Sequence, residues 1–333
     1  MIDRRTFIRR ACRAGAVLAG TAGLATAYGF WEAAHIRIAR HTVIVPNLPP
    51  AFADKTVAVL ADLHHGPFVG IDFVREAVRR TNALAPDLVA LVGDYAHKGT
   101  DAHRQLPPCL EALSALSAPL GVFSVPGNHD MQRGGAVYRE RVAQTPLTDV
   151  TNGHYRVALG GEHLWIAGVD DLWWGKPDLD RALDGVPTGA AVVLLAHNPD
   201  FAEDKPDGRV GLVLSGHTHG GQVYLRGAGS GWLPSKYGAK YRHGLVSGPA
   251  SSVFVSRGLG EAGVPLRVNA PPEICLLTLK PSRATENTDG RSAFQAITTE
   301  GGQSASREKP PGSGKQVRGP HPIRAGFRGR TGT

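Results

Sequence analysis

Residues 210–221 read Val-Gly-Leu-Val-Leu-Ser-Gly-His-Thr-His-Gly-Gly, an apolar run followed at once by two histidines that stand between glycines. A short run rich in Val and Leu is typical of a buried strand, and the imidazole ring is a common metal ligand. This stretch therefore predicts a strand that ends in a pair of metal-binding side chains, His217 and His219.

Four earlier segments repeat the pattern of an apolar run followed by polar side chains. The runs occupy residues 56–61, 88–92, 120–125 and 192–196, and helix-like segments at residues 71–84 and 103–116 separate the first three. This alternation predicts an α/β fold, in which ligands lie beyond the carboxyl ends of the strands. The polar residues that follow the four runs are Asp62 with His64, Asp94, Asn128 with His129, and His197.

The residue types in these segments suit a pair of divalent cations. Two such ions about 3.5 to 4 Å apart can clamp a phosphoryl group and activate water near neutral pH, and carboxylate and imidazole groups are their usual ligands. Two aspartates, one asparagine and four histidines bring only two negative charges to two dications. The loaded site would keep a positive charge, which favours an anionic phosphate as substrate.

The ordered set of motifs resembles the calcineurin-like metallophosphoesterases from about residue 57 to residue 279. Residues 215–222, 233–238 and 256–260 are the most specific part and are similar to an envelope-associated subgroup with an N-terminal export signal or anchor. The resemblance implies one catalytic domain, folded as a four-layer α-β-β-α sandwich. It also implies a metal-dependent phosphoester hydrolase in which a hydroxide held by both metals attacks phosphorus. It assigns Asp62, His64 and His219 to one metal, Asn128, His197 and His217 to the other, Asp94 to both, and to His129 the role of the acid that protonates the leaving oxygen.

Two details leave the chemistry open. The mixed ligand set suits Mn, Fe or Zn alike. Many members of the family carry Gly-Asp-x-x-Asp at the second motif, where the last Asp orients the acid, whereas residues 93–97 read Gly-Asp-Tyr-Ala-His. His97 cannot accept a hydrogen bond as a carboxylate does, so the orientation and proton affinity of His129 are not fixed by the sequence.

The net charge of +8 is concentrated at the two ends of the chain. Residues 1–41 and residues 281–333 each carry a net charge of +5, which leaves about −2 for the residues between them. A basic groove for nucleic acid is therefore not expected in the folded part. Residues 281–333 are rich in Gly, Ser, Pro, Thr and Arg and lack apolar periodicity, which predicts a disordered basic tail. The expected domains are thus residues 1–41, 42–280 and 281–333.

The N-terminus has the plan of an export signal. Residues 3–9 read Asp-Arg-Arg-Thr-Phe-Ile-Arg, which resembles a twin-arginine signal, and an uncharged stretch follows at residues 14–31. Residues 25–27 offer a cleavage site, but the stretch is also close to the roughly 20 residues that span a bilayer. Cleaved signal and retained anchor therefore both remain open. Either one implies contact with the twin-arginine export machinery and places the catalytic domain on the outer face of the cytoplasmic membrane, or in the periplasm or outside the cell.

The leading hypothesis is a phosphodiesterase or pyrophosphatase that acts at the membrane surface on an envelope or lipid-linked substrate. The subgroup resemblance includes hydrolysis of UDP-2,3-diacylglucosamine in lipid A synthesis. That substrate is made in the cytoplasm while the signal points outside, so a phospholipid or cell-wall polymer is kept beside it. The alternatives are a non-catalytic metal-binding scaffold and a module that binds membrane or nucleic acid through its basic ends.

Two further stretches allow two interpretations each. Trp173 and Trp174 would either cover a lipid near the site or pack in the core. The basic and aromatic residues at 236–242 would either meet substrate phosphates or membrane headgroups, or form a solvated loop.

Overall fold

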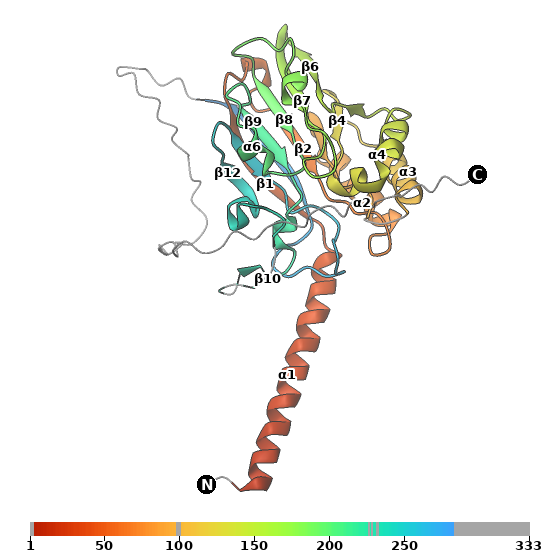
Figure 1. Cartoon of the computed structure of the whole chain (residues 1–333), viewed down its shortest axis with the longest axis vertical. Helices are drawn as coiled ribbons and strands as arrows, with labels where there is room; N and C mark the ends of the chain where they lie inside the picture. The colour runs from red at the N-terminus through yellow and green to blue at the C-terminus, as the bar shows by residue number, and fades with distance from the viewer. Residues whose placement is uncertain (1–2, 98–100, 226, 228, 231–232, 283–333) are drawn as a thin grey trace, which may run out of the picture. The chain divides into compact units, whose positions relative to one another are not determined.

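The computed structural model describes residues 3–97, 101–225, 227, 229–230 and 233–282. Within these residues, two six-stranded sheets face each other, and helices cover their outer surfaces (Figure 1). The α/β fold class predicted from the sequence is confirmed. The predicted tail falls outside the described residues from residue 283 onward.

The first sheet joins both ends of the catalytic domain. Its order is β1 (Arg37–Val45), β14 (Glu273–Pro281), β2 (Thr56–Leu60), β3 (Leu88–Val92), β4 (Val122–Val125) and β5 (Thr148–Asp149). The strands β2 to β5 are parallel, whereas β14 runs antiparallel to β2 and parallel to β1. All five residues of β3 are buried, which accounts for the unbroken Val and Leu run, because both faces of a parallel sheet are covered.

The second sheet has a parallel centre and antiparallel edges. Its order is β12 (Gly244–Ser247), β13 (Ser252–Val255), β9 (Leu212–Ser215), β8 (Val192–Leu195), β7 (Glu162–Gly168) and β6 (Gly153–Leu159). The strands from β13 to β7 are parallel, and β12 and β6 pair antiparallel at the two sides. Parallel strands carry their carboxyl ends to one edge, so the residues after β8 and β9 emerge together.

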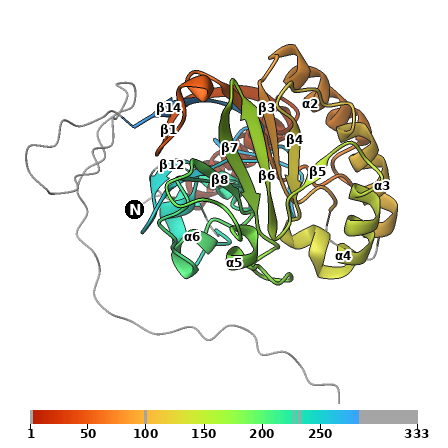
Figure 2. The same cartoon turned by 90° about the horizontal axis from the view of Figure 1, so that it is seen from above.

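Helices cover the outer face of each sheet, as Figure 2 shows for the first. That face carries α2 (Ile71–Ala83), α3 (Ala102–Leu113) and α4 (Asn128–Val142). The second sheet carries the shorter α5 (Leu179–Ala182) and α6 (Phe201–Asp204), with the 3-10 helix η3 (Gly238–Tyr241). Between the sheets, Val59, Phe123, Leu214 and Phe254 belong to one apolar core. The order helix, sheet, sheet, helix is the expected sandwich, with a thin second helical layer.

The structure adds elements that sequence patterns did not predict. Helix α4 begins at Asn128, within a segment interpreted as a strand end and turn. Strand β1 begins at Arg37 and crosses the boundary drawn at residue 41. The remaining short elements are η1 (Pro50–Phe52), η2 (His219–Gly221) and the ribbon of β10 (Tyr224–Leu225) with β11 (Gly229–Ser230).

The N-terminal helix α1 (Arg4–Ala33) is exposed along most of its length and contacts the domain at its last turns. The backbone N–H of Arg267 donates to the Gly29 carbonyl at 3.1 Å, and Ala33 and Ile36 are buried. Among the described residues, α1 included, no helix has both the length and the apolarity needed to cross a membrane.

Candidate metal centre

The predicted ligands follow strands of both sheets and meet in the crevice beyond their carboxyl ends. The chain leaves each strand directly into a turn or a helix, so the ligands are held by the rigid part of the fold. Asp62 and His64 follow β2, Asp94 follows β3, Asn128 and His129 begin α4 after β4, His197 follows β8, and His217 and His219 follow β9.

Two groups of potential ligands in this crevice match the predicted sets, and a third, His64, Asp94 and His129, shares a member with each of them. The ligand atoms of Asp62, His64 and His219 all lie within 4.8 Å of one another, and so do those of Asp94, His197 and His217. In the first group, His219 Nε2 lies 3.0 Å from His64 Nε2 and 3.5 Å from Asp62 Oδ1. In the second, His197 Nε2 lies 3.2 Å from His217 Nδ1 and 3.1 Å from Asn128 Oδ1.

Asp94 lies between the two groups. Its Oδ2 atom is 3.3 Å from His197 Nε2 and 3.5 Å from His64 Nε2. Its Oδ1 atom accepts a hydrogen bond of 2.8 Å from the His129 backbone N–H. One carboxylate therefore contacts a member of each group, as a bridging ligand must.

The donor set fits two divalent cations. The seven predicted ligands are all at most 6% exposed, and imidazole nitrogens that face one another at 3.0–3.2 Å share at most one proton, so a cation between them would satisfy lone pairs that protons do not. Nitrogen and oxygen ligands of this kind suit Mn, Fe and Zn. The residues present therefore fit a two-metal centre.

Unusual backbone geometry directs these side chains inward. Five of the ligands adopt positive φ angles: 52° at Asp62, 49° at His64, 57° at Asp94, 71° at His217 and 51° at His219. A non-glycine residue in this left-handed region costs about 1–3 kcal/mol and persists only where its surroundings enforce it. The enforcement includes backbone hydrogen bonds of 2.9 Å from Asp62 N–H to the Gly93 carbonyl and from His64 N–H to the Asp94 carbonyl.

Asp130 is a positioning residue whose role the sequence did not reveal. Its Oδ2 accepts from the backbone N–H groups of Asp94 (2.8 Å) and Gly127 (2.9 Å). Its Oδ1 accepts from Tyr95 (3.0 Å) and Ala96 (3.2 Å). One buried carboxylate thus fastens residues 94–96, after β3, to the start of α4. Its presence in the Gly-Asn-His-Asp segment was the only available signal, because three of its four partners lie 34–36 residues away.

Burial and neighbouring charges set the protonation of the ligands. Burial lowers the pKa of His64 and His219 and lowers that of His217 to about 3. Burial also opposes the charged form of His197, but the charges of Asp94, Asp62 and Asp171 and the hydrogen bond to Asp94 together outweigh burial and raise the pKa to about 10. Burial raises the pKa of Asp62 to about 7, partly offset by His197. Neutral imidazoles are the form that binds metal, so three of the four histidines are prepared for coordination.

His129, the predicted acid, lies beside the first group. Its ring centroid is 4.5 Å from that of His64, and His97 stands 6.1 Å away in the position where many family members have a carboxylate. The ring centroid of His97 also lies 5.9 Å from that of His64 and 5.7 Å from that of Phe68. The surroundings of His129 are therefore richer in imidazole than the resemblance implies.

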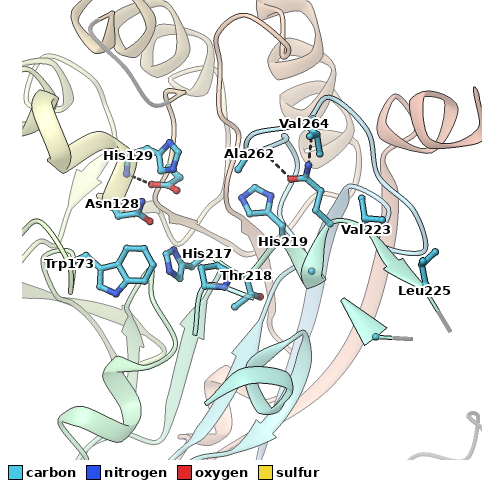
Figure 3. Close-up of a pocket in the computed structure, with 15 residues that line it drawn as sticks. Asn128, His129, Trp173, His217, Thr218, His219, Val223, Leu225, Ala262 and Val264 are labelled. Atoms are coloured by element: carbon cyan, nitrogen blue, oxygen red, sulfur yellow. Dashed lines mark hydrogen bonds between the residues drawn. The ribbon is translucent and has the colours of Figure 1, made fainter. Parts of the chain in front are cut away.

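A cavity of about 430 Å³ opens over the ligands. Figure 3 shows Asn128, His129 and Trp173 on one side of His219, and Val223, Leu225 and Val264 on the other. Trp173 lines the cavity, with its ring edge-on to His217 at a centroid distance of 4.4 Å. The core-packing interpretation therefore fails for this residue, which is 44% exposed.

The basic stretch after residue 235 is tied to α6 by ion pairs. Lys236 Nζ lies 2.6 Å from Asp204 Oδ2, and Lys240 pairs with Glu203. Tyr241 also donates to Glu203 at 2.9 Å. These lysines are neutralised within the fold, which disfavours their use for substrate phosphates.

Two further residues near the centre were missed by sequence reasoning. Arg267 is fully buried and donates to the carbonyls of Arg257 (3.0 Å) and Ala270 (2.8 Å) and to that of Gly260, and its Nη2 lies 3.3 Å from His219 Nδ1. Gln222 uses its side chain to bind the backbone of residues 262–266. Gln222 is the last residue of the segment 215–222, and Arg267 lies between β13 and β14. Only the folded chain brings the two residues to the same site.

Several known proteins are similar to this chain. A family model described as calcineurin-like phosphoesterase matches residues 55–221. The chain is 33% identical to an uncharacterized metallophosphoesterase, YkuE, of Bacillus subtilis, over 84% of this chain and 98% of that protein. It is 29% identical to the phosphodiesterase YaeI of Escherichia coli, over 84% of this chain and 100% of that protein. Among solved structures, Haemophilus influenzae NAD nucleotidase aligns at 14% identity with a TM-score of 0.40, covering 62% of this chain and 45% of that one, so the chain spans less than half of its length.

Replacement of Asp130 by Asn is expected to destabilise the fold. An amide offers one acceptor oxygen and an NH2 group that would face two backbone donors, so buried N–H groups lose their partners. We expect the free energy of unfolding to fall by about 2–4 kcal/mol. Urea denaturation with chelator at pH 8, above the pKa of about 7 to which burial raises Asp130, measures it. Asp180→Asn is the control, because the Asp180 side chain is 99% exposed. Equal stability of the two variants would contradict the positioning role of Asp130.

Glu261 is expected to give the stability a pH dependence. Burial raises its pKa to about 7 from an ordinary 4.5, with Arg267 opposing. Between these values the folded chain keeps a proton that the unfolded chain has lost, so stability declines as the pH rises from 4.5 to 7. Glu261→Gln removes the decline. The free energy of unfolding of the variant should exceed that of the wild type by near zero at pH 4.5 and by about 3 kcal/mol at pH 8. Urea titrations in chelator measure it, and an advantage that stays constant with pH would refute it.

Proposed function

The chain belongs to the calcineurin-like phosphoesterase family and is a phosphoester hydrolase, and from that premise we propose that it cleaves phosphodiester or pyrophosphate bonds in envelope or lipid-linked substrates with a two-metal centre. The position of Asp94 between the two ligand groups is the observation that carries this proposal. A carboxylate that reaches both groups accounts for the meeting of ligands from both sheets at this point.

The residues that would hold the ions are the seven described above. Asp62, His64 and His219 would hold one ion, and Asn128, His197 and His217 would hold the other, with Asp94 shared. When bound, two such ions supply Lewis acidity and lower the pKa of water. The protein contributes fixed ligand directions. His197 Nδ1 lies 2.7 Å from the Val92 carbonyl, which fixes the tautomer and aims Nε2 at Asp94 and Asn128.

His129 is assigned as the general acid. It lines the cavity, and its backbone N–H is bonded to Asp94 at 2.8 Å, so its place is tied to the bridging carboxylate. From there the imidazole can give a proton to the leaving oxygen of a phosphoester held over the ligands. His97 is also a neighbour of His129, with the two ring centroids 6.1 Å apart.

The form of the cavity supports a substrate with an apolar group. One side carries the polar ligands and the other carries Val223, Leu225 and Val264. UDP-2,3-diacylglucosamine, hydrolysed in lipid A synthesis, is one candidate, and an envelope phosphodiester such as a phospholipid is the other. The name of the Escherichia coli relative, a phosphodiesterase, supports the diester class.

Asp94→Ala in the full-length protein is expected to abolish metal-dependent hydrolysis. Loss of a residue that merely supports a ligand costs 10–100-fold, so loss of a shared ligand should cost more than about 100-fold. Bound Mn should fall from about two ions per chain, as measured by elemental analysis. The substrates are bis-p-nitrophenyl phosphate, p-nitrophenyl phosphate and UDP-2,3-diacylglucosamine, and the preferred one sets the class.

Asp180→Ala is the matched control for this experiment, because its side chain is 99% exposed. Hydrolysis that survives both chelation and Asp94→Ala would exclude the two-metal mechanism. Well-folded, metal-loaded protein that turns over none of the three substrates would favour the scaffold hypothesis.

We further propose that the catalytic domain works on the outer face of the cytoplasmic membrane after twin-arginine export. The support is the arginine-rich start of the chain and the uncharged stretch at residues 14–31. Replacing Arg4 and Arg5 by Lys should retain a fused reporter inside the cell, as measured by protease protection in spheroplasts. Unchanged export of the variant would contradict the proposal.

A further inference from the structure

The apolar side of the cavity is built from two segments that lie far apart in the sequence. Residues 222–225 follow the last metal motif, and residues 262–264 belong to the irregular segment between β13 and β14. Backbone hydrogen bonds of 2.9 Å join residues 222–225 to Val268, farther along the same irregular segment, from Tyr224 N–H to the Val268 carbonyl and from Val268 N–H to the Gln222 carbonyl. We call Val223, Leu225, Ala262 and Val264 the apolar wall.

The Gln222 side chain fastens the second segment to the first. Its Nε2 donates to the carbonyls of Val264 (2.7 Å) and Leu266 (3.3 Å), and its Oε1 accepts from Ala262 N–H at 2.9 Å. The bonds to Ala262 and Val264 appear as dashed lines in Figure 3. A single amide thus satisfies three backbone groups of a segment that has no regular secondary structure of its own.

The conformation of Gln222 shows that this arrangement is enforced. Its φ and ψ angles are 47° and −48°, outside the helical and extended regions that side chains favour, and the residue is only 8% exposed. Such a backbone persists where surrounding contacts over-determine it. The backbone N–H of Gln222 donates to the His219 carbonyl at 2.9 Å. The position of the wall is therefore tied directly to a predicted metal ligand.

We propose that Gln222 is a specificity-determining positioning residue. It holds the apolar wall where the alkyl or acyl chain of a group esterified to the substrate phosphate would rest. This inference rests on the proposed function and names the part of the substrate that the wall selects. Leu225 and Val264 remain 53% and 49% exposed, so a chain laid along them would cover apolar surface that the fold leaves open. Removing the amide would free residues 262–266 without touching a metal ligand.

The test compares two diesters with the same reacting centre, methyl p-nitrophenyl phosphate and octyl p-nitrophenyl phosphate, with the full-length Mn-loaded protein. An added methylene in an apolar site is worth about 10-fold or more. The wild type should therefore prefer the octyl ester at least tenfold in kcat/KM. Gln222→Met should lower this preference at least fivefold through the KM of the octyl ester. Its kcat for the methyl ester and its metal content should stay within twofold of the wild type.

Three further variants complete the design. Val264→Ser, which changes the wall itself, should lower the preference in the same way. Gln144→Met removes an exposed amide just beyond the end of α4, and Leu245→Ser removes an apolar side chain that is likewise 49% exposed, so both should match the wild type. Should Gln222→Met fail to fold, Gln222→Glu, which keeps the acceptor for Ala262, carries the same expectation.

Two results would overturn the assignment. An octyl preference that both Gln222→Met and Val264→Ser leave unchanged would mean that the wall does not select the substrate. A fall in kcat for both esters together with lost metal would mean that Gln222 serves the metal ligands instead. Hydrolysis of neither ester by metal-loaded wild type would refute the proposed function itself, which separates that failure from failure of the wall.

Discussion

The left-handed turns at the ends of β2, β3 and β9 are the constraint on which the site depends. Asp62, Asp94 and His217 each leave a buried strand with a positive φ angle, and this reverses the direction in which the side chain points. The cost of about 1–3 kcal/mol at each position is offset by hydrogen bonds between neighbouring loops, such as Asp62 N–H to Gly93. Without those turns, the ligands would follow the strand direction and diverge.

Glycine makes the close approach of these loops possible. At Gly258, φ is 69°, and a Cβ atom would lie 2.5 Å from the Cβ of Asp62. At Gly127, a Cβ atom would collide with the Asp94 carboxylate. The side chains of Asp62 and Asp94 are therefore packed against bare backbone.

Two buried charged residues next to this crevice, Asp130 and Arg267, are stabilised by backbone groups around them. Asp130 and Arg267 are fully buried and each is surrounded by backbone groups, carbonyls for the guanidinium and N–H groups for the carboxylate. A buried charge is tolerable only with such partners. These two residues hold the loops, while the ligands they position remain free to bind cations. In our proposal, chemistry and substrate selection are also separate, because strand ends supply the predicted ligands and irregular segments supply the apolar wall.

The sequence by itself determined the fold class, the strands that precede the metal motifs and the set of side chains that meet in the crevice. Short apolar runs identify buried strands, and polar residues directly after them are local signals. Tertiary structure decided the rest. The β1 edge strand, three of the four bonds of Asp130 and the amide clamp of Gln222 depend on partners that are distant in the chain; Gln222 and Ala262, for example, are 40 residues apart. Periodicity reports which face of an element is apolar, but it carries no information on which distant backbone group a buried polar side chain will meet.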